Sequence, residues 1–147
     1  MTSPAALVAL VQGIDAAIYG YSVAGAHVTG AGRRRALAGL SALRSDRDRA
    51  ASLVVAGGST PPGSAVAYTL PTRVTTAQTA RDLMSIVDNR LVGLAADAAA
   101  ALQGGERRWA ARTGVEAAIR AVTWGAPSQA FPAGPPVSSP GPSPSAG

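Results

Sequence analysis

Hydrophobic residues recur at spacings of three and four along four alanine-rich stretches of this chain, which predicts four amphipathic α-helices. Helix-start signals, such as Ser3-Pro4, and double-glycine stops set their limits. The predicted helices run from Ser3 to the Gly30-Ala-Gly32 stop, from Arg33 to about Ala56, from a capping box at Thr75 to the Gly104-Gly105 stop, and from Glu106 to about Trp124.

Each predicted helix carries one apolar stripe, which we expect to face a shared core. In the first helix the stripe includes Leu7, Leu10, Val11, Ile14, Ile18, Tyr21 and Val28, and in the second Leu37, Leu40, Leu43, Ala50, Leu53 and Val54. In the third it is Ala80, Leu83, Met84, Val87, Leu91, Leu94, Ala98 and Leu102, and in the fourth Ala111, Val115, Ala118, Ile119 and Val122.

The connection between the second and third helices, residues 59–75, contains three prolines and has no helical period. Its roughly 17 residues can reach some 55 Å when extended. A helix of about 24 residues is only about 36 Å long. The connection can therefore return the chain to the other end of the bundle, which is the single long crossover of a ferritin-like four-helix bundle. We predict an all-α fold of this type over residues 1–125.

From Gly125 onward the chain consists of Pro, Gly, Ser and Ala with few other residues, and it carries no charge. Such a segment buries too little apolar surface to offset its ordering entropy. We therefore expect residues 126–147 to be a disordered tail.

The net charge of +5 comes from thirteen basic residues that are all arginine and are spread along the predicted helices among acids. That pattern is typical of a solvated helix face, so we expect no nucleic-acid partner. The chain has no cysteine, which excludes disulfides and thiolate sites. Gln12, Asp15 and His27 interrupt the apolar first helix, and no basic segment precedes it. We therefore expect a cytoplasmic protein that does not enter a membrane.

Four short motifs resemble a known family. They are the Ala16–Tyr21 run, the Arg47-Asp48 pair, the Ala67–Pro71 segment of the crossover, and the Ala117–Arg120 run with Trp124. Together, over about residues 4–125, they are similar to the actinobacterial ferritin-like domain of unknown function. The resemblance implies a ferritin-like four-helix bundle and brings no established activity.

A di-iron site in such a bundle needs a Glu from each of two helices and Glu-x-x-His from each of the other two. This chain has only Glu106 and Glu116, neither followed by His at the required position, and its single histidine is His27. The family often carries Glu-His and His-Arg where this chain has Ile14-Asp15 and Leu43-Arg44. We therefore expect no catalytic, cofactor-binding or metal-ligating residues. The alternative is a metal-binding oxidoreductase or metal store with an atypical Asp/Glu site, in which Asp15, Asp48, Asp88 and Glu116 each supply one carboxylate.

Our interpretation of the same acids is a polar cluster between helices, since a partly buried carboxylate must be paired or protonated. Asp48 and Glu116 are its expected centre, with an arginine beside them and Asp15 nearby. The full candidate set is Asp15, Arg44, Arg47, Asp48, Asp88, Glu116 and Arg120. The function this favours is a non-catalytic scaffold or interaction module that associates with itself or with a protein partner.

Overall fold

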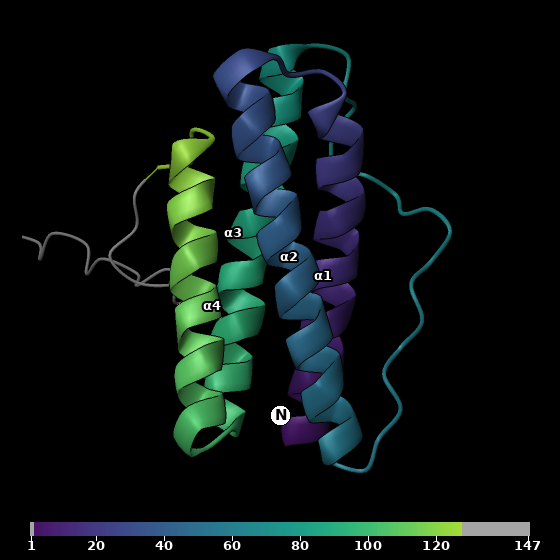
Figure 1. Ribbon diagram of the computed structural model, residues 1–147, viewed down its shortest axis with the longest axis vertical. Helices are drawn as coiled ribbons and strands as arrows, with labels where there is room; N and C mark the ends of the chain where they lie inside the picture. Colours follow the sequence, from purple (N-terminus) through teal and green to yellow (C-terminus); the bar gives the residue numbers. More distant parts are fainter. Residues whose placement is uncertain (1, 128–147) are drawn as a thin grey trace, which may run out of the picture.

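The computed structural model describes residues 2–127, and within that range it contains four α-helices and no strand (Figure 1). This confirms the predicted all-α, four-helix architecture. The expected tail lies outside the described residues, except for residues 126 and 127. The helices are α1 (Ser3–Gly25), α2 (Gly30–Ala56), α3 (Ala77–Ala101) and α4 (Gly104–Thr123).

The glycines that we took as helix stops begin the following helices instead. Gly30 and Gly104 are the first residues of α2 and α4, and each has a φ of 55°. Each follows an extended N-cap residue, Thr29 or Gln103. A left-handed residue after an extended one reverses the chain tightly, and glycine adopts that conformation without steric cost. The two hairpins of the bundle therefore enter their second helix with the same backbone geometry, and α1 ends at Gly25 rather than near Gly30.

Side-chain caps start α1 and α3 one residue away from their predicted positions. The Thr2 hydroxyl accepts a hydrogen bond from the backbone N–H of Ala5. Thr76 forms a capping box with Thr79, and not Thr75 with Gln78 as expected. Both caps satisfy backbone donors that the first turn of a helix leaves without partners.

The connection from α2 to α3 runs the length of the bundle along its α1–α2 side (Figure 1). As a result α2 and α3 are parallel, while the α1–α2 and α3–α4 hairpins are antiparallel. Leu70 and Val74 of the connection pack against the core, and two further contacts attach it to the helices. Arg47 donates to the carbonyl oxygen of Pro62, and the rings of Tyr19 and Tyr68 lie 5.5 Å apart between centroids. The long crossover that the sequence predicted is therefore present.

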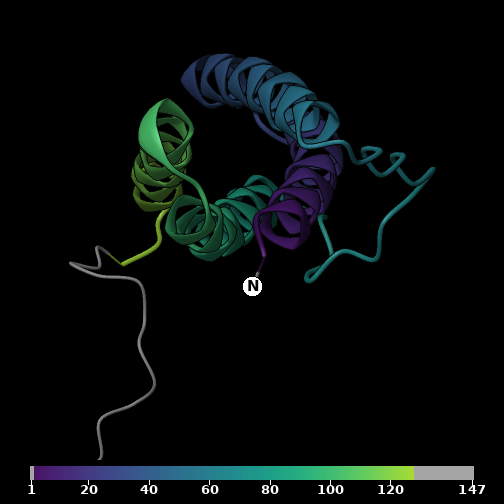
Figure 2. The ribbon, with the colours of Figure 1, turned by 90° about the horizontal axis from the view of Figure 1, so that it is seen from below.

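The helices pack in the order α2–α1–α3–α4, as the end-on view in Figure 2 shows. Extensive packing joins α1 to α2, α1 to α3 and α3 to α4, but not α2 to α4. We call the side of the bundle where α2 and α4 face each other without close packing the α2–α4 seam. Within the described bundle, it is the boundary between neighbouring helices at which the two backbones do not approach closely.

The core is built mainly on α1 and α3, where Leu10, Val11, Ile14, Leu83 and Leu91 are completely or almost completely buried. By length and composition alone, α1 is apolar enough to cross a membrane, and half of its most apolar window is buried inside the bundle. Its place between α2 and α3 accounts for that apolar composition.

The predicted core stripe of α4 is wrong. Val115, Ile119 and Val122 are 59%, 61% and 45% exposed. The opposite face is buried instead, through its small residues Ala110, Gly114, Ala117 and Ala121. A β-carbon added at Gly114 would lie 3.2 Å from that of Ala95, so α4 packs against α3 at very short range. Small side chains permit this approach, and the larger ones are turned outward. In α2, Leu37 is likewise exposed.

Candidate functional site

A buried polar network connects α1, α3 and α4. The Trp124 indole N–H donates to the Tyr21 hydroxyl at 2.9 Å, and that hydroxyl donates to Oδ2 of Asp88. The other oxygen of Asp88 accepts from Nε of Arg120 at 2.9 Å. Asp88 is 0% exposed, and both of its oxygens are engaged. This is how a buried carboxylate is retained in an apolar core, because an unpaired one costs several kcal/mol.

The remaining helix, α2, contacts this network through a glycine. The Tyr21 ring lies against Gly39 of α2, where an added β-carbon would stand 2.5 Å from Cε1 of the ring. Tyr21 also makes an edge-to-face contact with Trp124, with ring centroids 6.3 Å apart. The network therefore fixes the relative position of all four helices.

The environment shifts the proton affinities of the network members. Burial raises the pKa of Asp88 to about 6, against the opposing effects of Arg120 and Tyr21. Burial, followed by the charge of Asp88, raises the pKa of Tyr21 well above its ordinary value. Burial disfavours the charged form of Arg120, but its attraction to Asp88 leaves its pKa raised. Tyr21 and Arg120 consequently stay protonated throughout the physiological range.

A second ion pair joins α1 to α2. Arg47 Nε donates to Oδ1 of Asp15 at 3.0 Å, and this hydrogen bond is the main reason that the pKa of Arg47 is raised. Asp15 is buried, and its Oδ2 has no hydrogen-bond partner. Since Arg47 also binds the carbonyl of Pro62, this pair holds the crossover against the first hairpin.

Asp46 is an acid at the α2–α4 seam that we did not include in the candidate set. Burial, followed by repulsion from Glu116 and opposed by Arg120, raises its pKa to about 6. Its Oδ2 is buried without a partner, as is one terminal nitrogen of Arg120. The sequence contained a sign that Asp46 faces inward, because its position continues the apolar stripe of α2. The stripe then runs at intervals of three and four through Leu43, Asp46, Ala50 and Leu53.

The expected cluster around Asp48 and Glu116 is not formed. Both side chains are exposed, as is Arg44, and none of the three takes part in an ion pair within residues 2–127. The reason is helical phase. Asp48 follows Asp46 by two residues, a rotation of about 200° in an α-helix, so Asp46 faces inward and Asp48 faces solvent.

The other four candidates, Asp15, Arg47, Asp88 and Arg120, form two separate pairs rather than one cluster. The structure brings Tyr21 and Trp124 into the second pair. Large aromatic residues in an alanine-rich bundle usually anchor the core with their polar tips hydrogen-bonded, and these two have that role. Their partner could not be read from the sequence, because 67 positions separate Tyr21 from Asp88.

These residues do not fit a metal centre of the carboxylate-bridged kind. The inward carboxylates Asp15 and Asp88 each accept from an arginine, and His27 is exposed. No three His, Cys, Asp or Glu side chains between residues 2 and 127 gather as potential ligands. A guanidinium that already neutralises a carboxylate competes with a metal cation for the same oxygens.

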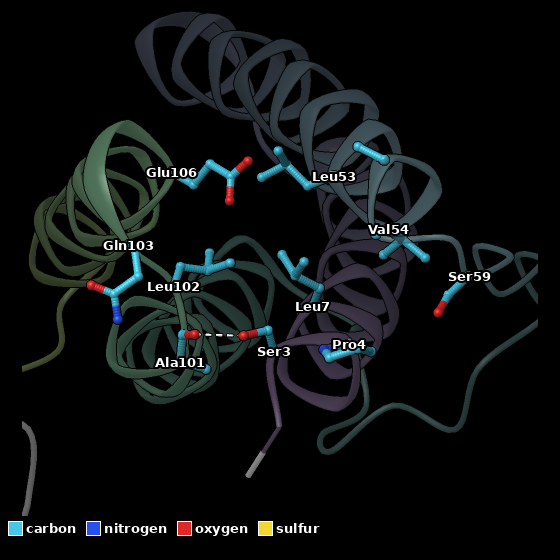
Figure 3. A pocket seen from close by; sticks show the side chains of 12 residues that line it. Ser3, Pro4, Leu7, Leu53, Val54, Ser59, Ala101, Leu102, Gln103 and Glu106 are labelled. Atoms are coloured by element: carbon cyan, nitrogen blue, oxygen red, sulfur yellow. Dashed lines mark hydrogen bonds between the residues drawn. The ribbon is translucent and has the colours of Figure 1, made fainter.

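A cavity of about 330 Å³ opens at the opposite end of the bundle, where the α2–α4 seam meets the N-termini of α1 and α4. Figure 3 shows Leu7, Leu53 and Leu102 along its wall and the Glu106 carboxylate pointing from α4 toward Leu53. The volume is at the small end of the range of ligand pockets.

Fold and site together define a class: an all-α, four-helix protein in which the two most deeply buried acids, Asp15 and Asp88, are paired with arginine. The family model described as a domain of unknown function, DUF4439, matches residues 6–136. Because that match covers most of the sequence, the chain belongs to this family. The match also extends past residue 125, where we expected the domain to end.

The chain is similar in structure to a conserved hypothetical protein, rv2844, from Mycobacterium tuberculosis, known from a crystal structure. The TM-score is 0.80 and the sequence identity is 26%, over 83% of this chain and 93% of that chain. None of the curated proteins matches the chain. The relatives therefore agree with the helical fold and assign no activity to it.

Proposed function

We propose that this chain is a ferritin-like domain that serves as a non-catalytic interaction module and pairs with a second copy through the outer face of α4. The observation that carries the proposal is the exposed apolar stripe of Val115, Ile119 and Val122. Its residues have the spacing of a core stripe, but the helix buries its small-residue face instead. A row of large apolar side chains on one exposed helix face is typical of a surface that binds another protein.

The stripe suits pairing with itself. Val115 and Val122 lie four residues before and three residues after Ile119. In an antiparallel helix pair related by a two-fold axis near Ile119, each Val115 therefore faces the partner's Val122. Such an isologous contact needs a patch that complements its own rotated copy.

The oligomeric state of the full chain tests this proposal. We expect light scattering after size exclusion to give a dimer mass that falls to the monomer mass on dilution. Replacing Ile119 with Arg places charge at the two-fold axis and should yield a monomer with an unchanged helical spectrum. The matched control is Val66→Arg, because Val66 is fully exposed on the crossover and lies away from α4. A monomeric wild type, or equal effects of the two substitutions, contradicts the proposal.

We also infer that the chain has no di-metal function, because its arginine-paired acids do not fit a di-metal centre. In a di-iron bundle the inward acids are metal ligands, whereas here Asp15 and Asp88 accept from Arg47 and Arg120. Elemental analysis of protein purified from iron-, manganese- and zinc-supplied cells tests this reading. We expect less than 0.1 metal ion per chain as a rough bound, since arginine-paired carboxylates are poor ligands. A stoichiometric metal would support the oxidoreductase or metal-store alternative.

A further inference from the structure

We propose that the end cavity is a binding site for a small linear aliphatic ammonium ion, with its alkyl chain among the leucines and its cationic end at Glu106. The cavity is lined by the first turn of α1, the last turns of α2 and α3, and the first turn of α4. Nothing in the helical scaffold requires a hollow there. It lies at the end of the α2–α4 seam, where the two helix backbones do not approach closely.

The walls of the cavity select for an alkyl chain. Leu7 of α1, Leu53 of α2 and Leu102 of the α3–α4 turn contribute apolar surface and are themselves almost fully buried, so their positions are fixed by the core. Two hydroxyl side chains line the cavity, those of Ser3 and Ser59, and the Ser3 hydroxyl is already used as a donor to the carbonyl oxygen of Ala101. A ligand chain in this cavity meets a preformed apolar surface and few competing polar groups, as in most small-molecule sites.

Glu106 determines the charge of the ligand. Its side chain points across the cavity toward Leu53 (Figure 3), and it forms no ion pair within residues 2–127. The neighbouring Arg107 does not neutralise it, because Arg107 donates to the carbonyls of Ala99 and Leu102. The first turn of α4 favours an anion at this position. A carboxylate that faces apolar side chains without a counter-ion complements an ammonium group carried on a hydrocarbon chain.

Titration of the full, isotope-labelled chain with hexylammonium, hexanol and hexanoate at neutral pH tests the assignment by nuclear magnetic resonance. We expect saturable shifts at Leu7, Leu53 and Leu102, with hexylammonium binding about fivefold more tightly than hexanol, as for an exposed ion pair. Hexanoate should be the weakest of the three. From butyl- to hexylammonium, affinity should rise by about fourfold for each methylene that becomes buried.

Two substitutions separate charge from shape. Glu106→Gln should lower the affinity for hexylammonium to that for hexanol. Glu116→Gln is the matched control, because Glu116 is the only other glutamate, is exposed on the same helix and does not line the cavity. Ala101→Leu adds three carbons to the cavity wall and should weaken all three ligands.

Three results would overturn the proposal. They are equal affinity for the three ligands, equal effects of the two glutamate substitutions, and shifts that do not saturate at millimolar ligand. Each variant is checked first by its circular dichroism, and the wild-type ranking of ammonium over alcohol and carboxylate decides the question even where a variant fails to fold.

Discussion

Arg120→Met removes the guanidinium from the buried network and leaves the Asp88 carboxylate with a single hydrogen bond, from Tyr21. Removing one partner of a buried ion pair costs about 3–5 kcal/mol, because the other charge is left uncompensated. The Arg120 side chain is 16% exposed, so solvent moderates the loss, and we expect about 3 kcal/mol at pH 8. Arg112→Met, at an exposed arginine of the same helix, should change stability by less than about 0.5 kcal/mol.

The loss should depend on pH with a defined sign. The folded pKa of Asp88 is raised from 3.8 to about 6, so the stability that it contributes is fully present below pH 3.8 and is lost as pH rises through 6. Arg120 lowers this pKa through its charge and its hydrogen bond. Without Arg120 the folded pKa rises further, and the variant should continue to lose stability above pH 6. Asp46, whose pKa Arg120 also lowers, adds an effect of the same sign.

Urea unfolding followed by far-ultraviolet circular dichroism at pH 5 and pH 8 measures the effect. At pH 5 Asp88 is largely protonated in both proteins, and the variant should lose only about 1 kcal/mol, for a hydrogen bond between the two side chains. A double variant, Asp88→Asn with Arg120→Met, has no charge at either position of this pair and should be more stable at pH 8 than Arg120→Met alone. An equal loss at pH 5 and pH 8 would refute the reasoning.

Two further predictions concern the helices themselves. Gly39→Ala should lose about 1–3 kcal/mol, because its β-carbon would stand 2.5 Å from the Tyr21 ring, whereas Gly93→Ala meets nothing within 4 Å and should gain up to about 1 kcal/mol. Thermal unfolding measures both, and a Gly39→Ala protein as stable as the wild type would show that the ring does not need the glycine. Thr76→Ala removes the cap of α3 and should cost about 1 kcal/mol in the same assay; no change would mean that water replaces the cap.

The helix pattern and the crossover could be predicted from the sequence because both depend on local information. Apolar spacing identifies a helix wherever its large residues face the core, as they do in α1 and α3. The crossover followed from a comparison of two lengths, since a connection longer than a helix can reach the other end of the bundle. Neither argument requires knowledge of which residues meet in space.

The interpretation of α4 failed for a physical reason. Hydrophobic spacing gives weight to large side chains, so it selected Val115, Ile119 and Val122. The closely packed α3–α4 pair instead buries alanine and glycine, which leave room for the helix backbones to approach. In an alanine-rich helix both faces have an apolar period, and only the packing partner determines which face is buried.

The sequence predicted that partly buried acids pair with arginines, but not which arginine pairs with which acid. Burial requires that a core acid have a partner, and this holds for Asp88 with Arg120 and for Asp15 with Arg47. The partners in each pair are 32 positions apart and lie on different helices. Their pairing depends on the rotation of each helix about its axis. The same rotation brings Asp46 inward and Asp48 outward, which residue type alone does not reveal.

The topology explains why Asp46 and the end cavity lie along the α2–α4 seam. A single long crossover makes α2 and α3 parallel and leaves α2 and α4 as the two outer helices of the packing order. Because these two helices do not approach each other closely, Asp46 and Arg120 are only half-buried there and Glu106 is exposed, so none of the three bears the full penalty of burial in a packed core. Charged side chains and a cavity are tolerated at this seam because the two helices do not pack closely there. The α2–α4 seam is consequently the part of this fold that can change its residues, and with them its ligands, at the least cost to the core.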